Sequence, residues 1–150
     1  MFLNESQKAA EEAVIKFFDL LCKKDVKMNE FESLIQSSYR LQQEAITGRI
    51  DKSAVWDDKE KKFVSNKDRS KIIRLRGWQD AIQNLLNKMP KSYRILKATQ
   101  YDSINMVQFD VELSTRFLKT IYCSPNVIRE NDVWQINPVS TYPRKKRKRK

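Results

Sequence analysis

The apolar residues in the first part of the chain follow a helical period. Between Asn4 and about Lys24 they recur at steps of three and four, and charged residues occupy the positions between them. The members of this apolar stripe are Ala10, Ala13, Val14, Phe17, Phe18 and Leu21. The spacing predicts an amphipathic helix that buries one face. Asn4, with Gln7 three positions later, suits the cap of its first turn.

Two further helices are predicted from the same spacing. The first covers residues 29–46, and the Thr47-Gly48 pair can end it because glycine readily adopts the left-handed backbone of a helix end. The second covers residues 68–89 and stops at Pro90, which cannot continue a helix. Both segments carry their apolar residues on one face, so both are expected to pack against a shared core.

The stretch between these two helices, residues 49–67, is polar and charged. Two apolar pairs, Val55-Trp56 and Phe63-Val64, stand on either side of a run of charged residues. This arrangement suits either a short hairpin or a mobile loop, and the pattern does not decide between them. Trp56 and Phe63 can stack on unpaired nucleic-acid bases or, alternatively, pack against the domain.

After Pro90 the period changes from helical to alternating. Strands are predicted over residues 93–101, 104–115 and 117–124, and a fourth within residues 127–139. Alternation along a whole strand indicates one wet face and one buried face, as in an antiparallel meander packed against helices. The candidate turns are Asp102-Ser103, residues 114–116 and residues 130–132.

The sequence therefore predicts an α+β fold in which three N-terminal helices pack on a four-stranded antiparallel sheet. We expect a single domain over residues 1–142, followed by a disordered basic tail over residues 143–150. A chain of 150 residues with 40% hydrophobic residues can build a core of this kind.

The charge is unevenly distributed along the chain. The sequence holds 30 Lys and Arg against 19 Asp and Glu, a net charge of +11, but residues 1–58 and 98–143 are mildly acidic. The excess lies in a central block, residues 59–97, and in the last seven residues, which are all basic. Two concentrated blocks of this sign create a field that can hold a polyanion.

The tail is the strongest candidate for a binding site. Its density of cations neutralises phosphates and releases counterions, which produces salt-sensitive affinity without sequence preference. The same run also suits a nuclear import signal, or a solvated tail without a dedicated partner. The candidate anion-binding residues of the tail are Arg144, Lys145, Lys146, Arg147, Lys148, Arg149 and Lys150.

The central block is a second candidate contact surface, which the tail would extend. Its candidate anion-binding residues are Lys61, Lys62, Arg69 and Arg76, with Arg69 and Arg76 on the wet side of the third predicted helix. The alternative is that these charges only keep the domain soluble.

Several chemistries are excluded by composition. The sequence has no His, so it lacks the base of the Ser-His and Cys-His nucleophile pairs, and with only Cys22 and Cys123 it cannot form a zinc–thiolate cage. Gly48 and Gly77 are the only glycines, which excludes a P-loop and a dinucleotide fingerprint. We expect no cofactor and no metal.

No apolar run reaches the length of a signal peptide or a membrane span. We therefore expect a protein that stays where it is made, in the cytoplasm, or in the nucleus if the host has one and the tail is an import signal. Two distant cysteines suit reduced thiols in such a compartment.

A pocket is a further candidate. Four tyrosines and an aspartate can line a cavity and polarise a small ligand, since proton abstraction needs a carboxylate beside a donor. The side chains considered for this role are Tyr39, Tyr93, Tyr101 and Tyr122, with Asp102 or Asp110. Asp110 alternates with the apolar positions of its strand, so it is expected to face water.

One family has this order of three helices and an antiparallel meander. Residues 126–136, which end in Val133-Trp134-Gln135-Ile136 after a charged turn, match the final hairpin of that family. Over residues 5–139 the chain resembles the nuclear-transport-factor-two-like superfamily, the cone-shaped fold shared with ketosteroid isomerases. The resemblance implies a curved sheet wrapped by helices, with either a pocket or a partner-binding sheet face.

The resemblance also bears on function. Enzymes of this superfamily commonly carry an Asp or His in the cone with Tyr donors beside it, whereas this sequence has no His and no Asp that matches that motif. Members without catalytic residues act as dimerisation, scaffold or transport-complex modules. We therefore expect a non-enzymatic accessory module that binds a polyanion, nucleic acid first, while the folded cone contacts a protein partner or a second copy.

Two alternatives remain open. The chain can be a scaffold component of a transport or secretion assembly whose tail binds an acidic protein or a membrane surface. It can also be a small-molecule enzyme of the isomerase or dehydratase type found in the cone fold.

Overall fold

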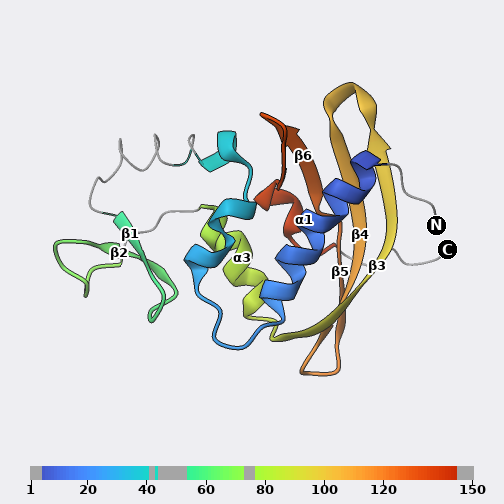
Figure 1. Cartoon of the computed structure of the whole chain (residues 1–150). Coiled ribbons are helices and arrows are strands. Elements are labelled where there is room, and N and C mark those ends of the chain that lie inside the picture. Colours follow the sequence, from blue (N-terminus) through green and yellow to red (C-terminus); the bar gives the residue numbers. More distant parts are fainter. Residues whose placement is uncertain (1–4, 41–42, 44–53, 73–76, 145–150) are drawn as a thin grey trace.

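A computed structural model describes residues 5–40, 43, 54–72 and 77–144 (Figure 1). The α+β class predicted from the sequence is confirmed, with helical segments before an antiparallel sheet. The elements are α1 (Glu5–Leu21), the 3₁₀ helix η1 (Met28–Leu34), β1 (Ala54–Asp57), β2 (Lys62–Ser65), α3 (Trp78–Leu86), β3 (Pro90–Tyr101), the 3₁₀ helix η2 (Asp102–Ile104), β4 (Met106–Thr115), β5 (Thr120–Cys123), β6 (Asn126–Glu130), β7 (Val133–Ile136) and the 3₁₀ helix η3 (Pro138–Thr141).

Strand β4 is the centre of a five-stranded antiparallel sheet. It pairs with β3 along one side, and along the other it pairs with β6 through its first half and with β5 through its second half. Between β5 and β6, Pro125 has no N–H for the ladder, but its carbonyl accepts a hydrogen bond of 3.0 Å from the Phe109 amide. β5 and β6 are thus two parts of one bent strand beside β4.

The region predicted to contain one final strand contains two. β6 and β7 form a hairpin around Asn131 and Asp132, which both have positive φ, as a tight two-residue turn requires. The predicted turn over residues 130–132 is therefore present, but the sheet has one strand more than the sequence predicted.

The core lies between the sheet and α1, which crosses one face of the sheet (Figure 1). Residues of β4 alternate between buried and half-buried, as the period of two predicted. The fully buried members facing the helix are Val107, Phe109, Val111 and Leu113. They pack in one cluster with the stripe of α1, in which Phe17 and Phe18 meet edge to face at a centroid distance of 5.3 Å.

The second predicted helix, 29–46, is interrupted. η1 ends at Leu34, Ile35 is extended and forms a parallel bridge with Ile136 of β7, and residues 37–40 and 43 are again helical. The Gln36 amide donates to the Ile136 carbonyl at 2.9 Å. Ile35 is fully buried at this edge, so pairing with a distant strand replaces the local helix. The predicted end at Thr47-Gly48 lies outside the described residues.

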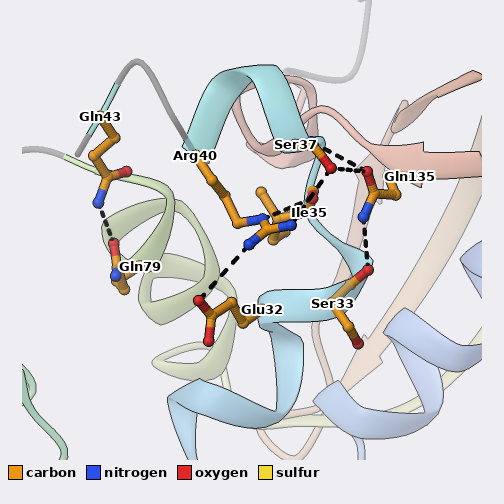
Figure 2. Close-up of polar contacts among 8 residues, drawn as sticks. All are labelled: Glu32, Ser33, Ile35, Ser37, Arg40, Gln43, Gln79 and Gln135. Carbon is orange, nitrogen blue, oxygen red and sulfur yellow. Dashed lines mark hydrogen bonds and ion pairs between the residues drawn. The ribbon is translucent and has the colours of Figure 1, made fainter. Parts of the chain in front are cut away.

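The side-chain amide of Gln135 holds the chain in place where the helix is interrupted (Figure 2). The amide and hydroxyl of Ser37 both donate to Gln135 Oε1, at 3.1 and 2.8 Å, and Gln135 Nε2 donates to the Ser33 carbonyl at 2.9 Å. Arg40 donates to the Ile35 carbonyl at 3.2 Å. The buried Gln135 therefore joins the chain on either side of Ile35 to the last strand of the sheet.

Within residues 49–67, for which the sequence allowed either a short hairpin or a mobile loop, the structure has a hairpin. β1 and β2 pair in antiparallel register, with Trp56 opposite Phe63 and their rings edge to face at 5.2 Å. Phe63 is 4% exposed, and Trp56 packs against the main core. Both aromatic rings are engaged within the fold, which favours packing over base stacking at these two positions.

The third predicted helix, 68–89, is shorter than expected. Within the described residues of that range, only Trp78–Leu86 is α-helical, and the Asp80 carboxylate caps it by accepting from the Gly77 amide at 3.0 Å. Ile72 instead forms an antiparallel bridge with Val64 of β2. The backbone before α3 therefore extends the small sheet, and β3 begins at Pro90, where the sequence predicted the helix to stop.

Candidate anion-binding cleft

A cleft of about 320 Å³ lies where four connections of the fold meet. It is lined by the end of α1 and the loop after it, the tip of the β1–β2 hairpin, the chain between α3 and β3, and the β4–β5 hairpin. In Figure 1 the β4–β5 hairpin lies at the lower end of the molecule and the β1–β2 hairpin lies at its left. We call it the basic cleft, after the four cationic side chains that line it: Lys23, Lys24, Lys61 and Arg116.

The positive charge of the basic cleft is largely unneutralised. Lys23 pairs with Glu30 at 3.1 Å, and the pKa of Glu30 lies below its usual value, chiefly because the Lys27 amide and then Lys23 donate to its carboxylate. Within the described part of the chain, Lys24, Lys61 and Arg116 form no ion pair, and all three are exposed. Asp25 is the one acidic residue in the lining.

Backbone strain gathers at the same place. Asp25, Lys61 and Met89, which all line the basic cleft, have φ values of 57°, 58° and 56°. Side chains other than Gly, Asn and Asp adopt this left-handed region at a cost in free energy, and such costs concentrate at functional sites. The cost falls on Lys61 and Met89, since aspartate tolerates this region more readily.

The wall of the basic cleft holds no activated nucleophile. Its apolar part comes from Leu21, Val26, Leu86, Met89 and Pro90. Cys22 also lines it, but burial, with a smaller effect from Asp19, raises the pKa of its thiol to about 11. Because the thiolate is the nucleophilic form, this thiol is unreactive at neutral pH. The arrangement of cations can hold an anion.

The structure separates the residues that the sequence grouped in the central block. Lys61 lines the basic cleft, and Lys62 follows it at the start of β2, opposite Asp57. Arg69 does not lie on a helix: it follows β2 and pairs with Asp57 at 3.2 Å. The pKa of Asp57 is lowered, chiefly because the Glu60 amide donates a hydrogen bond to its carboxylate. The charged form of this carboxylate pairs with Arg69. Arg76 lies outside the described residues.

The first residue of the basic tail is attached to the sheet. The Arg144 amide donates to the Tyr122 carbonyl at 2.7 Å in an antiparallel bridge, and its guanidinium lies 3.6 Å from Asp110. The predicted role of Arg144 as part of a free tail therefore needs correction, since part of its charge is matched by Asp110. The other predicted tail residues, Lys145 to Lys150, lie outside the described residues.

The sequence did not single out Lys23, Lys24 or Arg116 as site residues. They lie in residues 1–58 and 98–143, which carry a net negative charge. Counting charge by segment therefore does not reveal these three cations. Their positions did carry a signal: two lysines end the first predicted helix, and the arginine lies in a predicted turn. Cations at element ends that meet in space form a site only after the tertiary fold is known.

The side chains considered for a catalytic pocket do not converge. The Tyr93 hydroxyl donates to Asp19 at 2.8 Å, and the Tyr101 hydroxyl donates to Gln108 at 3.4 Å. Asp110 accepts from Ser124 at 2.9 Å and faces away from the core. Among the described side chains of this set, no carboxylate lies beside two tyrosine donors, and the side chain of Asp102 lies outside the described residues.

We predict that the fold loses stability in alkaline solution. The pKa values of Tyr93, Cys22 and Cys123 are all raised, mainly by burial, Cys123 to about 12. A raised pKa means that the folded chain holds the proton more tightly, so the stabilisation is complete below the unfolded pKa of 9–10 and is lost above it. Denaturant titrations should give a free energy of unfolding that falls steadily above pH 9.

A matched variant tests the cause. Tyr93→Phe keeps the ring contact with Phe18 but removes one titrating group, so its stability should fall less steeply with pH than that of the wild type. A free energy of unfolding that stays constant through pH 11 in the wild type would contradict the assignment.

No helix in the described ranges is long and apolar enough to cross a membrane. In the same part of the chain, no three His, Cys, Asp or Glu side chains gather as a metal site would require. In comparisons with known proteins, no protein family, no curated protein and no solved structure matches this chain.

Proposed function

We propose that the protein is a non-enzymatic accessory module that binds a polyanion, nucleic acid in the first instance, through the basic cleft and the basic tail. The observation that carries the proposal is the meeting of Lys24, Lys61 and Arg116 around one cleft. They come from three separate connections of the fold, and none of them has an acidic partner among the described residues. Phosphates bound there would displace counterions, which favours binding at low salt.

The geometry favours an extended anion over a single buried phosphate. α1 and α3 both end at the basic cleft, and the C-terminal end of a helix carries partial negative charge. That charge stabilises the lysines but repels an anion on the floor of the cleft. A chain of phosphates that passes across the rim, held by the long exposed side chains, avoids this repulsion.

The course of the chain supports a joint role for the tail. At Arg144 the backbone runs antiparallel to β5, toward Thr120 and the hairpin that carries Arg116. Tyr122 lies two residues from that end of β5, about 7 Å at the usual rise of a strand. Six residues span at most about 20 Å when extended, so the basic tail can reach the basic cleft from Arg144.

In the same proposal, the folded part is a platform of the nuclear-transport-factor-two-like type for a protein partner or a second copy of the chain. The order of helices, hairpin and meander supports it, as does Trp134, which packs against the core from the last strand. The side of the sheet away from α1 offers Tyr101, which is 40% exposed, next to Met106.

The proposal is tested by fluorescence anisotropy with labelled single-stranded RNA and duplex DNA at several salt concentrations. We expect the full chain to bind, with an affinity that falls steeply as salt rises. A chain ending at Arg144 lacks the six cations of residues 145–150 but keeps the bond to Tyr122. Absence of binding to either nucleic acid by the full chain at moderate salt would overturn the proposal.

A further inference from the structure

The tip of the β4–β5 hairpin exposes two neighbouring large apolar side chains. Phe117 is 66% exposed and Leu118 is 92% exposed, between Arg116 and Lys119. Arg116 lines the basic cleft, and Phe117 follows it directly in the chain, with its Cα about 3.8 Å from that of Arg116. An aromatic ring and cations are thus presented together at this edge.

The tip is held rigidly. The Thr115 amide and hydroxyl donate to the Lys119 carbonyl at 2.9 and 3.0 Å, and the Leu118 amide donates to the Thr115 carbonyl at 3.3 Å. The Arg116 amide donates to the Met89 carbonyl at 2.9 Å, which ties the tip to the chain after α3. A ligand that meets Phe117 therefore does not have to order the loop first, and this lowers the cost of binding.

The backbone conformation of the tip is also energetically unfavourable in the absence of a ligand. Leu118 has a φ of 59°, a region that glycine or asparagine occupies at lower cost. Its side chain gains almost no burial in return. A strained backbone that presents exposed apolar groups next to a charged cleft points to a contact with a ligand.

We propose that Phe117 stacks on an unpaired base and that the ligand of the basic cleft is a single-stranded nucleic acid. This inference rests on the proposed polyanion binding. Sites for single strands combine cations along the backbone with aromatic side chains on which bases stack. In a duplex the bases stack on one another, so Phe117 gains no contact there. Trp56 and Phe63, the aromatic pair of the β1–β2 hairpin, already contact each other.

The shape of the site favours a strand over a lipid surface. Lys24 and Lys61 line a concave cleft, whose rim a flexible strand can follow and a flat bilayer cannot. Phe117 and Leu118 are a small apolar anchor for a membrane, whereas one aromatic ring is enough to stack on a base.

The test uses fluorescence anisotropy with a labelled short oligo(dT) and a duplex of equal length. Phe117→Ala in the full chain should weaken single-strand binding by about 5- to 150-fold, the range that follows from the measured worth of one stacked base. Duplex binding and the salt dependence should not change, because no charge is removed. Phe117→Tyr should retain single-strand affinity, since its ring can stack.

A matched control comes from the other end of the sheet. Ile104, in the β3–β4 connection, is 57% exposed, so Ile104→Ala removes a similarly exposed apolar side chain and should leave binding unchanged. Comparable losses for Phe117→Ala and Ile104→Ala would overturn the stacking role.

The remaining outcomes separate the two proposals. If the wild type binds single strand and duplex equally and Phe117→Ala changes neither, stacking is wrong and polyanion binding stands. If the wild type binds neither, both proposals fail.

Vesicles of phosphatidylcholine with and without phosphatidylglycerol then test the membrane surface. Binding to the anionic vesicles that is lost in Phe117→Ala and in Leu118→Ser would assign the tip to lipid.

Discussion

Removal of residues 145–150 is expected to cause the largest loss of nucleic-acid binding. Each cation that contacts a single strand contributes about 0.7 to the slope of log affinity against log salt concentration, so six lost cations should flatten the slope by about 4. The chain should end at Arg144, because that residue pairs with Tyr122 and Asp110. Affinity measured at several salt concentrations, with and without the tail, gives both slopes.

A second truncation separates charge from structure. A chain ending at Pro143 also loses the bond to Tyr122, so any loss of stability should occur in this chain and not in the one ending at Arg144. If the chain ending at Arg144 binds as tightly as the full chain and with the same salt slope, the tail has no part in binding.

Replacement of Phe109 by alanine is expected to have the largest effect on stability. Phe109 is fully buried in the middle of β4 and belongs to the cluster that joins the sheet to α1. Truncation of a buried phenylalanine costs about 3–5 kcal/mol, through lost burial and the cavity left behind. That is a large fraction of the 5–15 kcal/mol by which domains are typically stable. Urea titration followed by circular dichroism should show the shift of the midpoint.

Leu96→Ala is the matched control. Leu96 lies in β3 of the same sheet but is 42% exposed, so its truncation should change the free energy of unfolding by about 0.5 kcal/mol or less, as surface substitutions usually do. Equal losses for the two variants would contradict the assignment of Phe109 to the core.

The parts of the fold that were predicted well depend on local periods. The stripe of α1 and the alternation of β4 lie within single elements, and both appear within a few residues of the expected bounds. Of the two later helices, one is interrupted at Ile35 and the other is shorter than predicted, because Ile35 and Ile72 satisfy a helical period and yet pair with Ile136 and Val64. Such pairings compete with the helix only when distant strands lie beside it.

The candidate site could be predicted only in part for the same reason. Lys61 was selected because its neighbours along the chain are basic. Lys24 and Arg116 lie among acidic segments, so only the packing of α1 and the β4–β5 hairpin brings them to the same cleft. Arg69 was assigned to a helix face that does not form, and its charge is instead held by Asp57.

The central claim, that the basic cleft binds phosphates, is tested most directly by removing its three unpaired cations from the full chain. Lys24→Gln, Lys61→Gln and Arg116→Gln together should flatten the salt slope for a single strand by about 2. The control replaces Lys8, Lys67 and Lys97 by Gln, since these exposed lysines do not line the cleft and carry the same total charge.

The account predicts a weaker affinity and a flatter slope for the cleft variant than for the control. Equal slopes in the two variants would mean that binding follows net charge alone, and would contradict the cleft as the site.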